Sequence, residues 1–311
     1  MAQAYIADIT PPADRSKKMG LIGMAFGLGF TLGPFVGAES LALWGETGPG
    51  WVAAALCAAN FLLALFILTE SHKPNSSQAA PRPHLDQWLH TLRQPKVGFL
   101  VIVFFFATFC FSCFESTLTK LVGANFHLDF KRDATSARAV GYLFVYCGLI
   151  GALVQGGAIG RLVKKMGEPK LIALSLVLTA ASFAWIPFIK GTSQLSWSVL
   201  VQHDGLPWVW LLLALALLSV GTSLTRPPLF GMISNLTPAH EQGVTIGVAQ
   251  GAGSLARIPG PLFANALLPW LPPLPYLICA AVLLGTTVLV GRRLFLGDPP
   301  AAEGKTANLA R

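Results

Sequence analysis

The stretch Ala4–Ala38, AYIADITPPADRSKKMGLIGMAFGLGFTLGPFVGA, is apolar, rich in glycine and closes on a Gly-Pro pair. A related stretch, MISNLTPAHEQGVTIGVAQGAGSLARIPGPLFANA, occupies Met232–Ala266. Without gaps, at an offset of 227, eight of 32 positions are identical between 6–37 and 233–264. The matches include Thr10-Pro11 with Thr237-Pro238 and Gly33-Pro34 with Gly260-Pro261. Two such pairs at one offset predict a duplicated architecture.

The composition predicts a membrane protein with many helices. Of the 311 residues, 53% are hydrophobic and only 12% are charged, about half the charged share of soluble domains. The apolar residues form eight blocks of roughly the 20 residues that a transmembrane helix needs. Because lipid cannot satisfy bare backbone groups and the blocks do not alternate as barrel strands do, we expect an all-α polytopic fold with eight full transmembrane helices and an N-terminal helix stub. The expected spans are 20–40, 51–69, 97–118, 140–160, 170–188, 207–225, 243–264 and 273–291.

The distribution of the basic residues predicts the topology. If residues 1–19 are cytoplasmic, sixteen of the 22 Lys and Arg residues fall in inner segments, Arg226 among them. Five fall in outer segments, including Lys120 and Arg138, and Arg257 alone lies inside a span. This is the positive-inside asymmetry. The net charge of +8 therefore indicates cytoplasmic N- and C-termini in the cell membrane, and no nucleic-acid partner.

The repeat also predicts the division into domains. Its offset leaves room for six spans between the copies, so the natural unit is six helices, present twice. The second unit is complete, whereas the first lacks three helices and most of a fourth. We expect a remainder of the first bundle at 1–69, a cytoplasmic linker at 70–96, the second bundle at 97–291 and a cytoplasmic tail at 292–311.

The first Gly-Pro pair belongs to a regular pattern of small residues. Gly29, Gly33 and Gly37 are spaced by four, so they share one helix face and let another helix approach closely. Pro34 removes a backbone donor and bends the helix. The pattern predicts a kinked, closely packed helix between two bundles that slide against each other.

Here the chain resembles a known family. AYIADIT followed by GLGFTLGPFVGA is similar to drug/proton antiporters of the major facilitator superfamily, which include the tetracycline efflux proteins. Gly29, Gly33, Pro34 and Gly37 match the antiporter motif, although Ala38 replaces a second glycine. The resemblance implies alternating access between two six-helix bundles and proton-driven export of a small amphipathic compound. It also assigns Asp8 and Arg15 to a charge network at the inner surface.

A second resemblance lies in GRLVKKMGEPK, Gly160–Lys170. It is similar to the superfamily's loop signature, in which the charges bridge helix ends and lock one conformation. Lys164 replaces the acidic residue of that signature, which weakens this implication. The glycine spacing predicts a tight turn. The matching residues are Gly160, Leu162, Lys165 and Gly167.

The third resemblance is QGAGSLARIPGP in the seventh expected span, which is similar to runs in drug transporters of the superfamily. Arg257, Gly260 and Pro261 form the second copy of the Gly-Pro motif, with Gly253 expected on the same face. A charge inside lipid is costly and faces protein or water. A structural role for Arg257 between helices is favoured over direct substrate contact, and both interpretations stay open.

Three further polar residues are candidates for a proton or substrate pathway. Glu115 is the acidic residue well inside an expected span, so it is either a pathway residue or a solvated residue at the mouth. Gln155 either lines a cavity or bonds across helices. Gln250 lies two turns before Arg257.

The sequence favours no enzymatic class. It contains no catalytic triad, metal-ligand set, phosphate loop or nucleic-acid motif, so we expect no enzyme activity, cofactor or metal. Five cysteines inside spans form no disulfide framework, and Cys110 and Cys113 are interpreted as packing residues. The expected partners are a small-molecule substrate, protons and lipid, for a monomer. The alternatives are a truncated fragment without transport, and an importer or uniporter of a metabolite.

Overall fold

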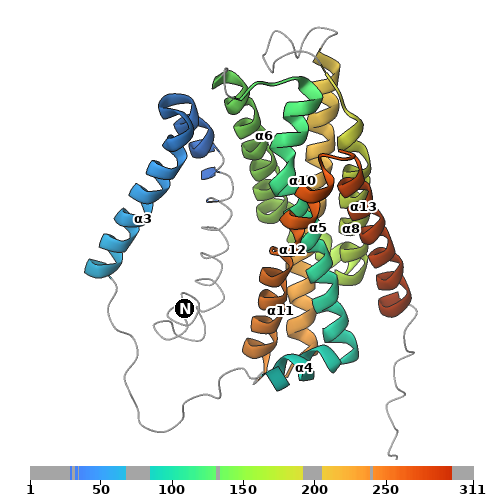
Figure 1. Cartoon of the computed structure of the whole chain (residues 1–311). Coiled ribbons are helices and arrows are strands. Elements are labelled where there is room, and N and C mark those ends of the chain that lie inside the picture. The colour runs from blue at the N-terminus through green and yellow to red at the C-terminus, as the bar shows by residue number, and fades with distance from the viewer. Residues whose placement is uncertain are drawn as a thin grey trace, which may run out of the picture.

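The computed structural model describes residues 29, 32–33, 35–67, 85–130, 134–191, 205–238 and 241–295. The regular elements in that part of the chain are helices (Figure 1), which confirms the all-α class. They are η1 (Gly45–Thr47), α3 (Gly48–Ile67), α4 (Leu85–Arg93), α5 (Pro95–Phe126), α6 (Ala134–Leu153), η2 (Val154–Ala158), α7 (Ile159–Met166), α8 (Glu168–Trp185), η3 (Ile186–Phe188), α10 (Leu206–Leu236), α11 (Gln242–Ala256), α12 (Pro259–Leu267), α13 (Leu274–Val290) and η5 (Gly291–Phe295).

Six helical segments of the described chain are long and apolar enough to cross a membrane. They are Phe35–Ile67, Pro95–Phe126, Thr135–Met166, Glu168–Phe188, Leu206–Leu236 and Leu274–Leu294. The first of them is interrupted by the turn η1, where Gly45 has a φ of 71°. The expected span 20–40 lies partly outside the described residues.

Some expected spans are longer in the structure than the sequence predicted, and two of them run past a charged residue within one unbroken α-helix. The span expected at 97–118 continues to Phe126 in α5, and the span expected at 207–225 continues to Leu236 in α10. Lys120 and Arg226 are expected from the sequence in the loops that follow these two spans. These charged side chains do not stop the helices, because a backbone in an apolar medium keeps its internal hydrogen bonds whatever the side chain.

The seventh expected span, 243–264, is two helices rather than one. Helix α11 ends at Ala256, and α12 begins at Pro259. Arg257 and Ile258 form the turn between them, where their N–H groups bond to carbonyls three residues back. Pro259 and Pro261 cannot donate backbone hydrogen bonds, which explains why the ladder is interrupted here.

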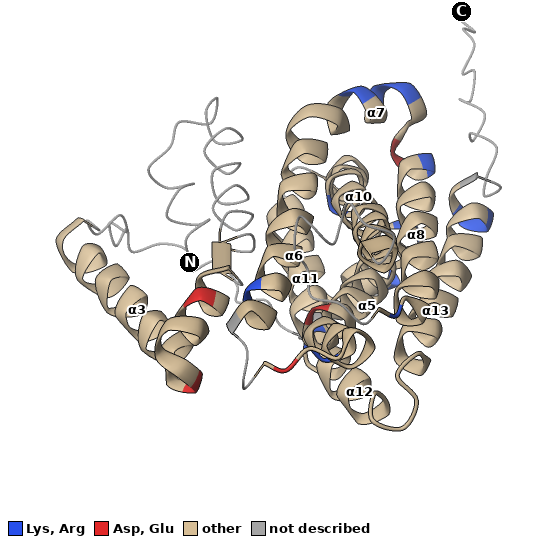
Figure 2. Ribbon diagram, turned by 90° about the horizontal axis from the view of Figure 1, so that it is seen from above, with Lys and Arg blue, Asp and Glu red and all other residues tan. Residues whose placement is uncertain are grey.

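The helices from α5 to α13 pack into one bundle in which α10 lies between α6 and α8 (Figure 2). Small polar residues join α8 to α10: the Ser182 hydroxyl donates to the Ala214 carbonyl at 2.8 Å, and the Thr225 hydroxyl donates to Ser175 Oγ at 3.0 Å. Close contact through small residues is the usual way in which membrane helices associate. This pair is therefore joined by direct polar contacts as well as by close packing.

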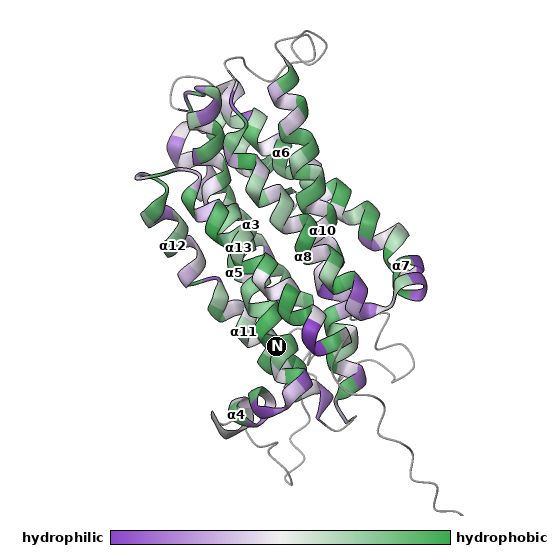
Figure 3. Cartoon of the chain, turned by 90° about the vertical axis from the view of Figure 1, so that its right-hand side faces the viewer, coloured by the Kyte–Doolittle hydropathy of each residue, from purple (hydrophilic) through white to green (hydrophobic). Residues whose placement is uncertain are grey.

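The surface of the bundle is apolar along the helices, and hydrophilic residues gather at α4, α7 and the helix ends (Figure 3). Helix α3 lies to one side of the bundle (Figure 1) and is apolar, with Trp51 75% and Phe66 85% exposed. Such a distribution suits a helix surrounded by lipid or by other apolar helices. It is the distribution of a multi-pass membrane protein.

Candidate functional site

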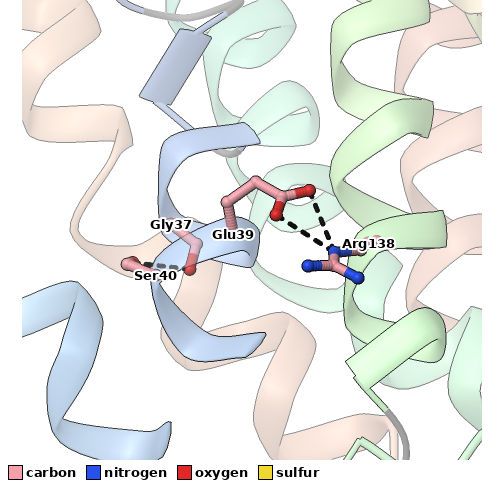
Figure 4. A network of polar contacts seen from close by, with 4 residues as sticks. All are labelled: Gly37, Glu39, Ser40 and Arg138. Carbon is pink, nitrogen blue, oxygen red and sulfur yellow. Dashed lines mark hydrogen bonds and ion pairs between the residues drawn. The ribbon is translucent and has the colours of Figure 1, made fainter. Parts of the chain in front are cut away.

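A polar contact joins the N-terminal part of the described chain to the bundle. Nε of Arg138, in α6, donates to both carboxylate oxygens of Glu39 at 3.1 and 3.0 Å (Figure 4). One turn away along each helix, the rings of Phe35 and Tyr142 stack with their centroids 5.9 Å apart. Arg138 and Tyr142 lie in the first half of α6, and α6 begins at the end of the bundle opposite to α4 (Figure 1). They form an ion pair and an aromatic stack across the gap between two groups of helices.

The predicted antiporter motif lies directly before this contact. Gly29, Gly33 and Gly37 are helical, and apart from their chain neighbours and the nearby backbone of their own helix, no atom of the described chain lies within 4 Å of a Cβ built on any of them. Their predicted close packing is therefore not seen among the described residues. The Gly37 carbonyl accepts a hydrogen bond from the Ser40 hydroxyl at 2.9 Å (Figure 4). Pro34, Asp8 and Arg15 lie outside the described residues.

The loop signature forms the connection between α7 and α8. Gly167 has a φ of 78° and a ψ of 158°, a conformation that is open to glycine and costly for other residues. Gly160 and Leu162 lie inside α7 instead, and Lys165 is exposed in its last turn. The tight turn predicted from the glycine spacing thus depends on Gly167 and not on Gly160.

Gly167→Ala is expected to lower the free energy of unfolding by about 1–3 kcal/mol, because alanine cannot adopt this backbone conformation without strain. Gly160→Ala is the matched control, since Gly160 is helical with open space around it. Its expected effect is neutral or slightly stabilising. Thermal unfolding of both variants in detergent measures the difference, and equal melting temperatures would contradict the role given to Gly167.

The second Gly-Pro copy is closely packed. A Cβ on Gly260 would lie 3.0 Å from the Phe109 carbonyl oxygen, and the Cys113 thiol donates to the Gly260 carbonyl at 3.2 Å. Helix α12 therefore approaches α5 backbone to backbone, with Pro261 beside this contact. Arg257 is exposed, whereas Gly253 and Gly260 are buried. The turn between α11 and α12 separates Arg257 from the face that the sequence predicted it to share with these glycines.

The candidate pathway residues lie on three different elements. Glu115 is half-buried in α5, Gln155 is exposed in the π-turn η2, and Gln250 is half-buried in α11. None of these three side chains hydrogen-bonds to another side chain in the described part of the chain. A π-turn frequently marks a functional position in a helix, which adds a structural argument for Gln155.

Sequence reasoning missed three features of the site. Arg226, expected in an inner loop, lies inside α10, a helix of membrane length. Lys120, expected in an outer loop, lies inside α5, and its Nζ donates to Asn265 Oδ1 at 2.6 Å. The Glu39–Arg138 pair was also missed, because its members are 99 positions apart and no local pattern connects them.

Apolar helices of membrane length, packed through small residues and joined by few polar contacts, define a multi-pass membrane protein. A family model described as Major Facilitator Superfamily matches residues 1–202. The chain belongs to the major facilitator superfamily, a family of transporters.

Relatives of known name agree with this assignment. The chain is 31% identical over 266 residues to the tetracycline resistance protein, class E, of Escherichia coli, covering 84% of this chain and 59% of that protein. It is 29% identical over 294 residues to the human major facilitator superfamily domain-containing protein 10, covering 86% of this chain and 57% of that protein. The chain thus spans somewhat under three-fifths of the length of each of these two relatives.

A solved structure has the same fold. The crystal structure of the human organic anion transporter MFSD10 (TETRAN) superimposes with a TM-score of 0.60 and 26% sequence identity. The match covers 93% of this chain and 66% of that chain. The predicted fold is thereby confirmed as that of a major facilitator transporter.

Proposed function

We propose that the protein is a secondary active transporter of the cell membrane that exports a small amphipathic compound in exchange for protons. The relatives named tetracycline resistance protein support export of a drug-like compound. The antiporter motif at Gly29, Gly33, Pro34 and Gly37 supports coupling to protons. The protein works as a monomer with both termini in the cytoplasm.

The observation that carries this proposal is the contact of Glu39 and Phe35 with α6. An alternating-access transporter needs two groups of helices that touch at one side of the membrane in one state and separate there in the next. Among the described residues, the ion pair and the stack lie in the first half of α6, which begins at the end of the bundle opposite to α4. We assign residues 1–69 and 97–291 to the two bundles and 70–96 to the cytoplasmic linker, so that this contact closes the outer side.

The test uses the purified protein in liposomes with an acidic lumen and an alkaline medium. If protons leaving the lumen drive the exchange, tetracycline accumulates inside, and a protonophore abolishes the accumulation. Protein-free liposomes with the same gradient give the background, because tetracycline itself distributes with pH. Uptake that survives the protonophore would instead indicate a uniporter, and uptake equal to the background would indicate a chain without transport activity.

A further inference from the structure

A groove lies between the end of α8 and the start of α10, at the end of the bundle opposite to α4 (Figure 1). Its volume is about 440 Å³, which is within the range of small-molecule sites in proteins. A smaller hollow of about 290 Å³ lies at the end of α5, and Lys190 lines both spaces. The groove is lined by Trp185, Phe188, Ile189, Lys190, Pro207 and Trp210, and the hollow by Ala124, Asn125, His127, Lys190 and Gly191.

The segment that carries Lys190 is fixed to the end of α5 by three hydrogen bonds. Asn125 Nδ2 donates to the carbonyls of Pro187 and Ile189 at 3.2 and 2.9 Å. In return, the N–H of Gly191 donates to the Asn125 carbonyl at 3.1 Å. The backbone around Lys190 therefore has a defined position between the groove and the hollow.

The groove lies where two membrane-length helical segments reach the boundary between hydrocarbon and water. Trp185 is the last residue of α8, and Trp210 is the fifth residue of α10. The first of these segments ends at Phe188, two residues before Lys190. Tryptophan is enriched at the level of the lipid headgroups, where its ring has an apolar body and a polar N–H. The rings of Trp185 and Trp210, with centroids 5.5 Å apart, therefore belong to this boundary.

The groove presents apolar side chains to its surroundings. Trp185 is 36%, Phe188 58% and Trp210 46% exposed, and apolar surface of this kind is unfavourable in water. Helix α8 lies on the side of the bundle away from α3 (Figure 2). The surroundings of the groove are therefore lipid and not the helices of the N-terminal part of the chain.

The charge beside the groove favours a lipid with a negative headgroup. The side chain of Lys190 is exposed and positively charged, and the exposed His127 lines the adjoining hollow. No Asp or Glu is among the described residues that line either space. A lysine ammonium group binds phosphate oxygens through short, charge-assisted hydrogen bonds, and basic residues at a membrane surface attract anionic lipids.

We propose that the groove binds one phospholipid with an anionic headgroup. The phosphate lies on Lys190 at the hollow, and the upper part of an acyl chain lies against Trp185, Phe188 and Trp210. The bound lipid joins the end of α8 to the start of α10 from the membrane side. This site goes beyond the proposed function, because it involves neither the transported compound nor protons.

The competing explanation is loose packing between two helix ends. Any acyl chain would then fill the groove, whatever headgroup it carries, and Lys190 would be an ordinary hydrated residue outside the membrane. The two explanations differ in headgroup selectivity. A built site prefers an anionic phospholipid through Lys190, whereas a packing gap has no preference.

The experiment titrates the purified protein in detergent with phosphatidylglycerol or phosphatidylcholine, each brominated on the same acyl chains. Bromine quenches tryptophan fluorescence at short range. We expect brominated phosphatidylglycerol to reach half of its quenching at a concentration at least fivefold lower than brominated phosphatidylcholine does. The protein has eight tryptophans. A variant with both Trp185→Phe and Trp210→Phe keeps the groove apolar and should lose this tighter quenching component.

Substitutions of lysine test the selectivity directly. Lys190→Gln should bind phosphatidylglycerol at least fivefold more weakly, no better than phosphatidylcholine, and Lys190→Arg should keep the preference. Lys170→Gln is the matched control, because Lys170 is an exposed lysine in the first turn of the same helix α8, at its other end. Its titration should equal that of the unmodified protein.

Three results would overturn the proposal: equal affinity for the two lipids, a preference that persists in Lys190→Gln, or a preference that remains in the double tryptophan variant. Loss of the preference in Lys170→Gln would also overturn it, because the lipid would then respond to net charge and not to position. Melting temperatures show whether the variants are folded. If Lys190→Gln does not fold, the comparison of the two lipids and the tryptophan variant still decide. No transport step enters the titration, so its result is independent of the liposome assay.

Discussion

Glu39→Arg is expected to lower the transport rate at least tenfold while the bundle stays folded. The substitution replaces the ion pair with Arg138 by a repulsion between two guanidinium groups, at the contact that we assign to the closed outer side. Both side chains are about a third exposed, so the attraction itself contributes only about 1 kcal/mol. Repulsion between the two guanidinium groups destabilises the closed contact by a similar amount. A change of about 1.4 kcal/mol shifts the equilibrium between two conformational states tenfold.

The matched control exchanges the two charges. Glu39→Arg combined with Arg138→Glu restores an attraction of opposite polarity and should recover transport to within about threefold of the unmodified protein. Proton-driven uptake into liposomes measures all three proteins, and their melting temperatures show that they are folded. If the exchange leaves the double variant as slow as Glu39→Arg alone, the pair does not stabilise a transport state through its charges.

The helices themselves could be predicted from the sequence because their signal is local. The block expected at 273–291 is α13, Leu274–Val290, and the block expected at 170–188 closely matches α8 with η3. Both begin beside a proline that suits a first helical turn. Long apolar runs determine these helices whatever they pack against.

The site could be predicted only in part, because its geometry depends on contacts between distant residues. Hydropathy treated Arg226 as the end of a helix, although its side chain reaches two phenylalanine rings from the middle of α10. The glycine pattern placed Arg257 on the face of Gly260, but a turn that ends at Pro259 interrupts the helix between them. No periodic pattern in the sequence connects the two members of an ion pair such as Glu39 with Arg138. Its members meet only after two helices have packed.

Gly221→Leu is expected to lower the free energy of unfolding by about 3 kcal/mol, the upper part of the range for overpacking a closely packed interior. At Gly221, α10 lies close against α8: a Cβ there would be 2.9 Å from the Thr179 backbone nitrogen and 3.0 Å from the Ser175 carbonyl oxygen. These are backbone atoms of a helix, so no side-chain rotation can make room. The two helices have to move apart, which also lengthens the hydrogen bond between Thr225 and Ser175.

Gly285→Leu supplies the control for this prediction. Gly285 lies in α13, is exposed and has open space where a Cβ would be, so the same substitution should change stability by less than about 0.5 kcal/mol. The Gly285→Leu variant also shows whether a larger apolar side chain lowers the stability of a transmembrane helix even where there is open space. Melting temperatures in detergent and the folded fraction after purification compare the two variants. A Gly221→Leu protein as stable as Gly285→Leu would mean that α8 and α10 are not held together at this glycine.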